Sequence, residues 1–209
     1  MPELQDAVAQ ASTVRRATEA DVDGLARALA RAFYDDPHAR WTSRDDAKRT
    51  RRLERAFAVG LRRIWLEQDE CWTTDGVVGG AFWMVPGRVH LSVAQQLMLL
   101  PAMLTAHGTS APRVIARLAK MDSMHPREPE HWYLPFIGVD PEWQGRGIGT
   151  ALLRPVLERC DRDGLPAYLE ASSPRNRACY ERNGFRVVEE YRLGRDGPPG
   201  WRMWREPVG

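Results

Sequence analysis

The feature that most limits what this chain can fold into is one stretch, residues 134–153, which reads LPFIGVDPEWQGRGIGTALL. An apolar run is followed by a turn at Asp140-Pro141, a glycine-punctuated loop and the start of a helical pattern. Glycines between a strand and a helix allow several backbone N–H groups to point into one concavity, and the helix start adds partial positive charge. The stretch therefore predicts a cradle for an anion such as a nucleotide-like pyrophosphate. The alternative interpretation is a glycine-rich turn that binds nothing.

The spacing of these glycines excludes two common phosphate-binding motifs. A Walker loop requires a Lys-Ser/Thr pair after its last glycine, and here Thr150 follows Gly149 without a lysine. A dinucleotide fingerprint requires a further glycine at position 150. The spacing of Gln144, Gly147 and Gly149 instead fits the pattern Q/R-x-x-G-x-G/A, which resembles the acyl-coenzyme A loop of the GNAT N-acetyltransferases.

Composition and charge indicate an ordinary cytoplasmic protein. A length of 209 residues favours one domain with a substantial core. The net charge of +2 is too small to indicate a nucleic-acid partner. Three cysteines without metal-ligand spacing are typical of reduced thiols in a cytoplasm. We expect neither a signal peptide nor a membrane partner, because residues 1–14 lack a basic region and the apolar runs are short.

Periodicity and turn residues predict one α/β domain over residues 12–209 after a disordered leader of residues 1–11. Helices are expected over 22–33, 43–67, 92–104 and 112–124, from the cradle to 163, and over 176–183. Strands are expected over 13–17, 70–74, 77–85, 131–139, 167–171, 185–192 and 201–205. This order implies one mixed sheet with helices on both faces. A helical insert at about 90–125 would roof a substrate pocket.

A second group of motifs follows the cradle helix. Residues 168–176 read YLEASSPRN, and residues 179–185 read CYERNGF. A strand, an asparagine at a helix start and a Tyr-Glu-x-x-Gly-Phe run together resemble the C-terminal half of a GNAT acetyltransferase. This resemblance implies a central sheet that is mixed but mostly antiparallel.

A weaker resemblance extends over almost the whole chain and is greatest to puromycin N-acetyltransferase and its relatives. It rests on VRRAT (14–18), Asp21-Val22, Trp83 with Pro86, HPREP (125–129), LEAS (169–172), PRN (174–176) and YER (180–182). The chain departs from those enzymes in the helical insert and in residues 33–41. Substrate specificity would lie there, so puromycin itself does not follow as the substrate.

The resemblance implies acetyl-CoA as the cosubstrate and no metal. Ile137, Gly138 and Val139 would pair through their backbone with the pantetheine arm, and the Val139 N–H would face the thioester oxygen. Asn176 would hydrogen-bond the pantetheine. The pyrophosphate would be held by Gln144, Gly145, Arg146, Gly147, Ile148, Gly149 and Thr150.

Two residues are candidates for acid–base catalysis. Tyr180 matches the family tyrosine that lies near the sulfur as general acid, and a phenol with a pKa of about 10 suits a thiolate leaving group. Its alternative role is that of a core tyrosine before a Gly-Phe turn. Glu170 lies on the strand beside the cradle strand, where it could take the ammonium proton directly or through water. It could equally be an ordinary exposed strand residue.

Two histidines offer a further alternative. His125 and His131 are candidate bases, and with Glu128 and Glu130 they could suggest a metal site. Because an H-x5-H pair without a closing ligand is a weak metal signal, we expect a surface loop instead.

For the amine pocket we expect flat apolar surface and one carboxylate, which suits a cationic or aromatic amine. The residues with these properties are Tyr34, Asp36, Trp83 and Tyr133. The leading hypothesis is an acetyl-CoA-dependent N-acetyltransferase that acts by direct attack of a small-molecule amine, antibiotic-like or a metabolite. The alternatives are protein or peptide Nα-acetylation and an acyl-CoA-binding regulatory module without turnover. A homodimer is expected from the resemblance alone.

Overall fold

The computed structural model describes residues 13–42, 47–68, 70–89 and 110–209, together with the single residues 95, 97 and 101. The expected leader and most of the expected helix 92–104 lie outside the described residues. Every other expected strand and helix falls within them or overlaps them.

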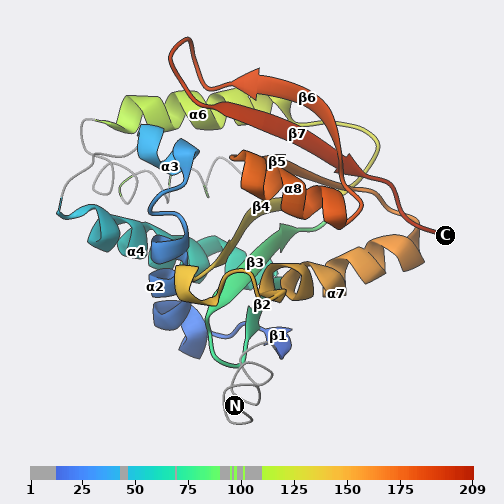
Figure 1. Ribbon diagram of the computed structural model, residues 1–209, viewed down its shortest axis with the longest axis horizontal. Coiled ribbons are helices and arrows are strands. Elements are labelled where there is room, and N and C mark those ends of the chain that lie inside the picture. The colour runs from blue at the N-terminus through green and yellow to red at the C-terminus, as the bar shows by residue number, and fades with distance from the viewer. Residues whose placement is uncertain are drawn as a thin grey trace.

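A seven-stranded sheet with the order β1-β2-β3-β4-β5-β7-β6 forms the centre of the molecule (Figure 1). Its strands are β1 (Val14–Arg16), β2 (Cys71–Thr74), β3 (Gly79–Met84), β4 (Trp132–Val139), β5 (Ala167–Ala171), β6 (Arg186–Arg192) and β7 (Pro199–Arg205). Neighbouring strands are antiparallel except β4 and β5, which are parallel. The expected mixed, mostly antiparallel sheet is therefore confirmed.

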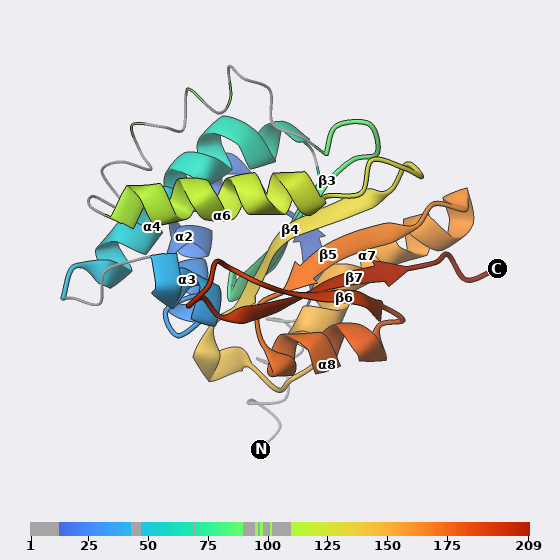
Figure 2. The same cartoon turned by 90° about the horizontal axis from the view of Figure 1, so that it is seen from above.

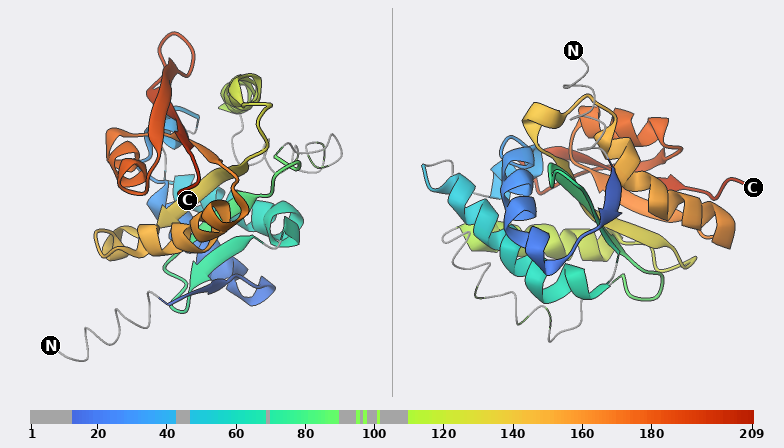
Figure 3. Two further views of the ribbon diagram at one scale, coloured as in Figure 1. Left: turned by 90° about the vertical axis from the view of Figure 1, so that its right-hand side faces the viewer. Right: turned by 90° about the horizontal axis from the view of Figure 1, so that it is seen from below.

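The described helices cover both faces of this sheet (Figure 3). They are α2 (Val22–Ala32), α3 (Pro37–Thr42), α4 (Arg49–Gly60), α6 (Ala111–Met124), α7 (Ile148–Asp163) and α8 (Pro174–Arg182), with short turns η1 (Glu19–Asp21), η2 (Leu61–Trp65), η3 (Leu66–Gln68) and η5 (Pro141–Trp143). Among the helices of the described ranges, none is long and apolar enough to cross a bilayer.

One helix was not expected. Pro37 ends the α2 segment as predicted, but it also opens α3, because proline suits the first position of a helix. The carboxylate of Asp36 accepts the N–H of Ala39 at 2.9 Å and so satisfies a free donor at the start of α3. A proline therefore separates two helices here and does not begin a loop.

The two faces of the sheet hold two separate cores. Along β3, Ala81 and Trp83 pack into the cluster that contains the buried side of α7, whereas Phe82 packs into the cluster that contains α2 and α4. Successive strand residues point to opposite faces, so a strand that is buried throughout can serve both cores.

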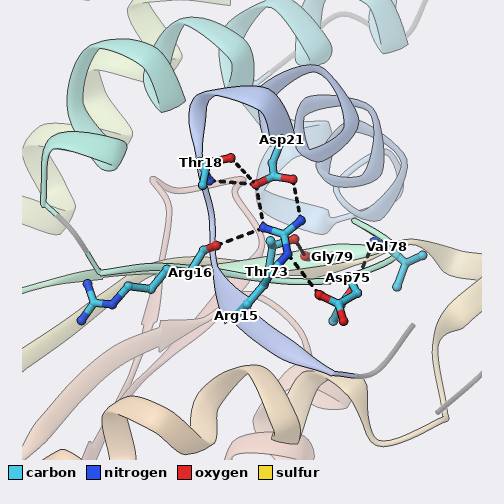
Figure 4. Close-up of polar contacts among 9 residues, drawn as sticks. Arg15, Arg16, Thr18, Asp21, Thr73, Asp75, Val78 and Gly79 are labelled. Atoms are coloured by element: carbon cyan, nitrogen blue, oxygen red, sulfur yellow. Dashed lines mark hydrogen bonds and ion pairs between the residues drawn. The ribbon is translucent and has the colours of Figure 1, made fainter. Parts of the chain in front are cut away.

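The edge strand β1 is held by one arginine (Figure 4). The Arg15 guanidinium donates two hydrogen bonds of 2.8 Å to Asp21 and one of 3.1 Å to Asp75. The N–H and hydroxyl of Thr18 donate to the same Asp21 carboxylate. Hydrogen bonding from Arg15 is the main reason that the pKa of Asp21 is lowered to about 2. The network joins β1 to the start of α2 and to the β2–β3 turn.

Candidate active site

The strands β4 and β5 pair only over their first residues. Their register joins Trp132 to Ala167, Tyr133 to Tyr168 and Leu134 to Leu169, and then it ends. β4 continues to Val139 alongside β3, while the last residues of β5 pair only with β7. The β4 edge over residues 135–139 therefore has no strand beside it on the β5 side among the described residues. Such an edge can accept an extended ligand through its backbone.

A bulge in β4 coincides with this separation. Phe82 and Met84 of β3 are two residues apart, but their partners Phe136 and Tyr133 on β4 are three apart, so β4 holds one extra residue. Pro135 lies in that interval and has no N–H to donate. The resemblance implied a free edge at residues 137–139 but not where β4 leaves β5, and the local signal that could have indicated that point was the proline inside the apolar run.

The glycine loop beyond β4 has the conformation that an anion cradle requires. Gly145 and Gly147 have φ values of +78° and +81°, in the left-handed region that favours glycine. The bond from the Ala151 N–H to the Gly147 carbonyl, 3.0 Å long, is the first of α7. The N–H groups of Ile148 to Thr150 precede it and have no acceptor within the helix. A Cβ placed on Gly145, Gly147 or Gly149 would meet no atom within 4 Å, so this side of the loop is open.

Side chains of the loop fix it to its surroundings. Gln144 Nε2 donates to the carbonyl of Val139 at 2.9 Å, which joins the loop to the end of β4. The guanidinium of Arg146 lies over the ring of Trp143, with 5.0 Å between Cζ and the ring centroid. The side chains of Gln144, Arg146 and Trp143 thus stabilise the loop conformation, while the backbone donors remain available to a ligand.

The start of α8 joins two residues that the sequence predicted separately. Ser173 caps the helix by accepting the Asn176 N–H at 3.2 Å. The Asn176 side chain donates to the Ser172 hydroxyl at 3.1 Å, and that hydroxyl donates to the Asp36 carboxylate. The expected pantetheine residue Asn176 and the expected pocket residue Asp36 therefore lie on either side of Ser172, which sequence reasoning did not assign to the site.

Glu170 has a buried carboxylate, although the residue as a whole is only partly buried. Tyr133 donates to its Oε2 at 3.0 Å, and its Oε1 has no hydrogen-bond partner among the described residues. Burial raises the pKa of Glu170 to about 7, against the opposing effects of hydrogen bonds from Tyr168 and Tyr133 and of the charges on Arg117 and Arg202. The alternative of an ordinary exposed strand carboxylate does not hold.

Tyr180 is both a core residue and a neighbour of this carboxylate. Its side chain is 8% exposed and packs against Phe185 with 6.0 Å between ring centroids. Burial raises the pKa of Tyr180, and the negative charges of Asp36 and Glu170 contribute in the same direction. The phenol is therefore protonated at neutral pH and can donate a proton or a hydrogen bond there.

The expected pocket residues do not all come together. Tyr133 reaches Glu170, and Asp36 reaches Ser172. Tyr34 is 36% exposed and its ring lies under the Arg49 guanidinium, with Cζ 4.9 Å from the ring centroid. Trp83 is 1% exposed in the core beside α7 and presents no open surface. Its expected role in binding the amine gains no support from this position.

The expectation of a surface loop around the two histidines is wrong. His125 and His131 are 8% and 2% exposed, and their Nε2 atoms lie 3.0 Å apart. His131 Nδ1 lies 2.7 Å from the Pro129 carbonyl, so the proton on Nδ1 leaves Nε2 free to accept from His125. The His125 ring packs on Tyr133 and Tyr168. No group of three or more potential metal ligands occurs in the part of the chain that the structure describes.

A depression on the surface lies away from the residues described above. It encloses about 700 Å³ between α2, α4 and the β2–β3 turn, and none of the expected site residues lines it. Tyr133 and Glu170 lie instead close to the point where β4 and β5 separate.

Comparison with known proteins shows which family and fold the chain resembles. Residues 114–185 match the model of the acetyltransferase (GNAT) family. Over 90 residues the chain is 40% identical to an uncharacterized N-acetyltransferase of Schizosaccharomyces pombe; the match covers 42% of this chain and 36% of that protein. The chain thus spans little more than a third of the length of that relative.

Solved structures extend the likeness to nearly the whole chain. A Corynebacterium glutamicum protein described as histone acetyltransferase HPA2 and related acetyltransferase is 26% identical, with a TM-score of 0.69 over 94% of this chain and 97% of that one. Arylalkylamine N-acetyltransferase 2 of Aedes aegypti is 12% identical and shares the fold, with a TM-score of 0.65 over 93% and 98% of the two chains. Residues 114–185 thus match the GNAT acetyltransferase family, and nearly the whole chain shares its fold with solved structures of acetyltransferases.

Proposed function

We propose that this chain is an acetyl-CoA-dependent N-acetyltransferase that acetylates a primary amine of a small molecule by direct attack. The observation that carries this proposal is the buried Glu170 carboxylate at the point where β4 and β5 separate, with the glycine loop at the far end of the same β4 edge. One end of this arrangement suits a pyrophosphate, and the other suits proton transfer.

The residues present fit acetyl-CoA. The backbone N–H groups of the loop and the first turn of α7 would hold the pyrophosphate, and the unpaired edge of Ile137, Gly138 and Val139 would hold the pantetheine arm. The Asn176 amide is oriented by Ser172, and its Oδ1 can accept a hydrogen bond from the pantetheine. When bound, acetyl-CoA supplies the acetyl group as a thioester.

Glu170 and Tyr180 would divide the proton transfers. A carboxylate with a pKa of about 7 is half ionised at neutral pH, so Glu170 can take a proton from the ammonium form of the acceptor. Tyr180 keeps its proton at that pH and can donate it, or a hydrogen bond, to the leaving sulfur. Two titrating groups with such separated pKa values are typical of an acid–base pair.

The alternatives differ from this proposal in what they require of the site. A regulatory acyl-CoA module needs no buried base, and the burial of Glu170 supports turnover instead. Peptide Nα-acetylation needs an open groove, whereas α6 and the β6–β7 hairpin flank β4 and β5 on opposite sides (Figure 2). The likeness to puromycin N-acetyltransferase, a cytoplasmic location and a homodimer remain proposals that rest on the sequence.

Release of CoA thiol from acetyl-CoA across a panel of amines tests the function. The panel contains puromycin, aminoglycosides, polyamines, arylalkylamines, amino acids and short peptides. We expect thiol release with at least one small amine. Release with peptides alone would replace the proposal by protein modification. Acetyl-CoA binding without release for any member would favour the regulatory module.

A further inference from the structure

One charged residue stands on the inner face of α6. Along this helix Ala111, Val114 and the following His125 are buried, and Met121 and Met124 are half-buried. Arg117 occupies the next position of the same helical row, and it is also half-buried. Its Nε atom is buried and has no hydrogen-bond partner among the described residues. A buried N–H without a hydrogen-bond acceptor is unfavourable, so this Nε atom calls for an acceptor.

Arg117 lies within electrostatic range of the candidate active site. Its positive charge acts on Glu170 and Tyr133, and in both cases it opposes the larger effect of burial, which raises their pKa values. It also acts on Tyr191, whose hydroxyl is buried without a partner among the described residues, and on His38 of α3. Arg117 thus lies within electrostatic reach of the base, although no ion pair joins the two.

A cavity of about 230 Å³ opens beside Arg117. It lies between α3, α6 and the end of β6, and the described residues that line it are Trp41, Ala116, Arg117, Lys120, Leu193 and Gly194. Two of these residues are cations, and none of the described ones is acidic. Trp41 and Leu193 add apolar surface. The lining therefore combines a positive end with a flat apolar wall.

We infer that this cavity binds a carboxylate group of the acceptor, so that the substrates are amines that also carry a carboxylate, as α-amino acids with a large apolar side chain do. Arg117 would bind the carboxylate through its forked N–H groups, a geometry that lysine cannot reproduce. The apolar part would lie against Trp41, and the amine would face Glu170. This inference rests on the proposed acetyltransferase function and narrows its substrate class.

The test uses acceptors in pairs that differ only in the carboxylate: tryptophan with tryptamine, and phenylalanine with phenethylamine. The variants are Arg117→Gln and Arg117→Lys, with Arg113→Gln on the exposed side of α6 as the matched control. We expect the parent protein to prefer the carboxylated member. We expect Arg117→Gln to raise its KM by about tenfold or more, the size of a lost charged hydrogen bond, and to leave the decarboxylated member within about threefold. Arg117→Lys should fall between them, and Arg113→Gln should match the parent.

A second measurement needs no turnover. Calorimetric titration with N-acetyltryptophan and N-acetyltryptamine in the presence of CoA compares binding of the two products. We expect the parent to bind the carboxylated product more tightly and Arg117→Gln to abolish that difference. Equal binding of both products by the parent would overturn the inference, whatever the enzyme assay shows.

The outcomes separate this inference from the proposed function. If the decarboxylated amines are acetylated as well as or better than the amino acids, the proposed acetyltransferase function is supported and the proposed carboxylate-binding cavity is wrong. If Arg117→Gln lowers activity equally for both members and shifts the pH profile, Arg117 acts on Glu170 and not on the substrate. If no acceptor of either series releases thiol and neither product binds, the inference is wrong, and the wider amine panel decides the proposed function separately.

Discussion

The hydroxyl of Tyr133 donates a 3.0 Å hydrogen bond to the Glu170 carboxylate across the only parallel strand pair among the described strands. The two residues lie on neighbouring strands β4 and β5, close to the point where these strands separate. The bond fixes the position of one carboxylate oxygen and leaves the other oxygen without a described partner. The predictions below follow from this relationship and from the loop beyond it.

Glu170→Gln should remove both the activity and its pH dependence. Glu170 serves as base only when it is ionised, so kcat/KM of the parent should rise with pH through about 7 and then level. The glutamine variant should lose about 10²-fold or more and show no such rise. The measurement is thiol release between pH 5.5 and 9. A parent profile that is flat across this range would contradict the role of Glu170.

The same substitution has a second consequence for stability. Because the pKa of Glu170 is raised in the folded state, the native protein loses stability as pH rises from the unfolded pKa through about 7. Glu170→Gln removes this loss, so its gain over the parent should be largest above pH 7, up to roughly 3 kcal/mol at about 1.4 kcal/mol per pKa unit. Urea unfolding at pH 5 and pH 8.5 measures the difference. A gain that is equal at both pH values would show that the carboxylate is not buried as described.

Tyr133→Phe should weaken the base without removing it. The lost hydrogen bond stabilises the ionised form of Glu170, so its pKa should rise further and activity should need higher pH. We expect a loss of about tenfold at pH 7 and a smaller loss at pH 9. Each pH series contains its own control, because damage to the pocket itself would lower the rate equally at both ends.

Tyr180→Phe should lower kcat by about 10²-fold and leave acetyl-CoA binding unchanged, since the substitution removes one proton donor and keeps the ring. The control is Phe185→Leu, which alters the packing of the same ring but not its hydroxyl. That variant should retain most of the activity despite lower stability. If Tyr180→Phe acetylates as fast as the parent while chemistry limits the rate, Tyr180 is a core residue only.

Gly149→Ala should weaken CoA binding by about tenfold without destabilising the fold. Its Cβ would meet no protein atom within 4 Å, so it would occupy the space proposed for the pyrophosphate, while alanine raises helix propensity. The control is Gly164→Ala, at the C-terminal end of α7, where the glycine has a left-handed backbone conformation. It should cost about 1 kcal/mol of stability and leave the CoA Kd unchanged. Equal CoA affinity in Gly149→Ala and the parent would contradict the proposed pyrophosphate site in this loop.

Local patterns determined much of this protein from the sequence alone. The glycine spacing at 145–149 and the end of the cradle helix at residue 163, before Gly164, depend on only a few residues, so each can be recognised without the fold. Strand and helix order followed from periodicity for the same reason, and with it the mixed sheet. Local signals missed α3, where Pro37 both ends one helical segment and opens the next, and they also missed the burial of His125 and His131.

The tertiary structure alone decided which chemistry-bearing residues meet. Ser172 reaches Asp36 across 136 residues of sequence, and α6 carries Arg117 to the neighbourhood of Glu170. The burial of Glu170, His125 and His131 depends on which elements cover β4 and β5. The hydrophobic pattern of these strands does not predict those elements. Burial and charge act through space between segments that are remote in sequence. The pKa of the base and the charge of the residues around it therefore depend on the assembled sheet and cannot be read from the sequence.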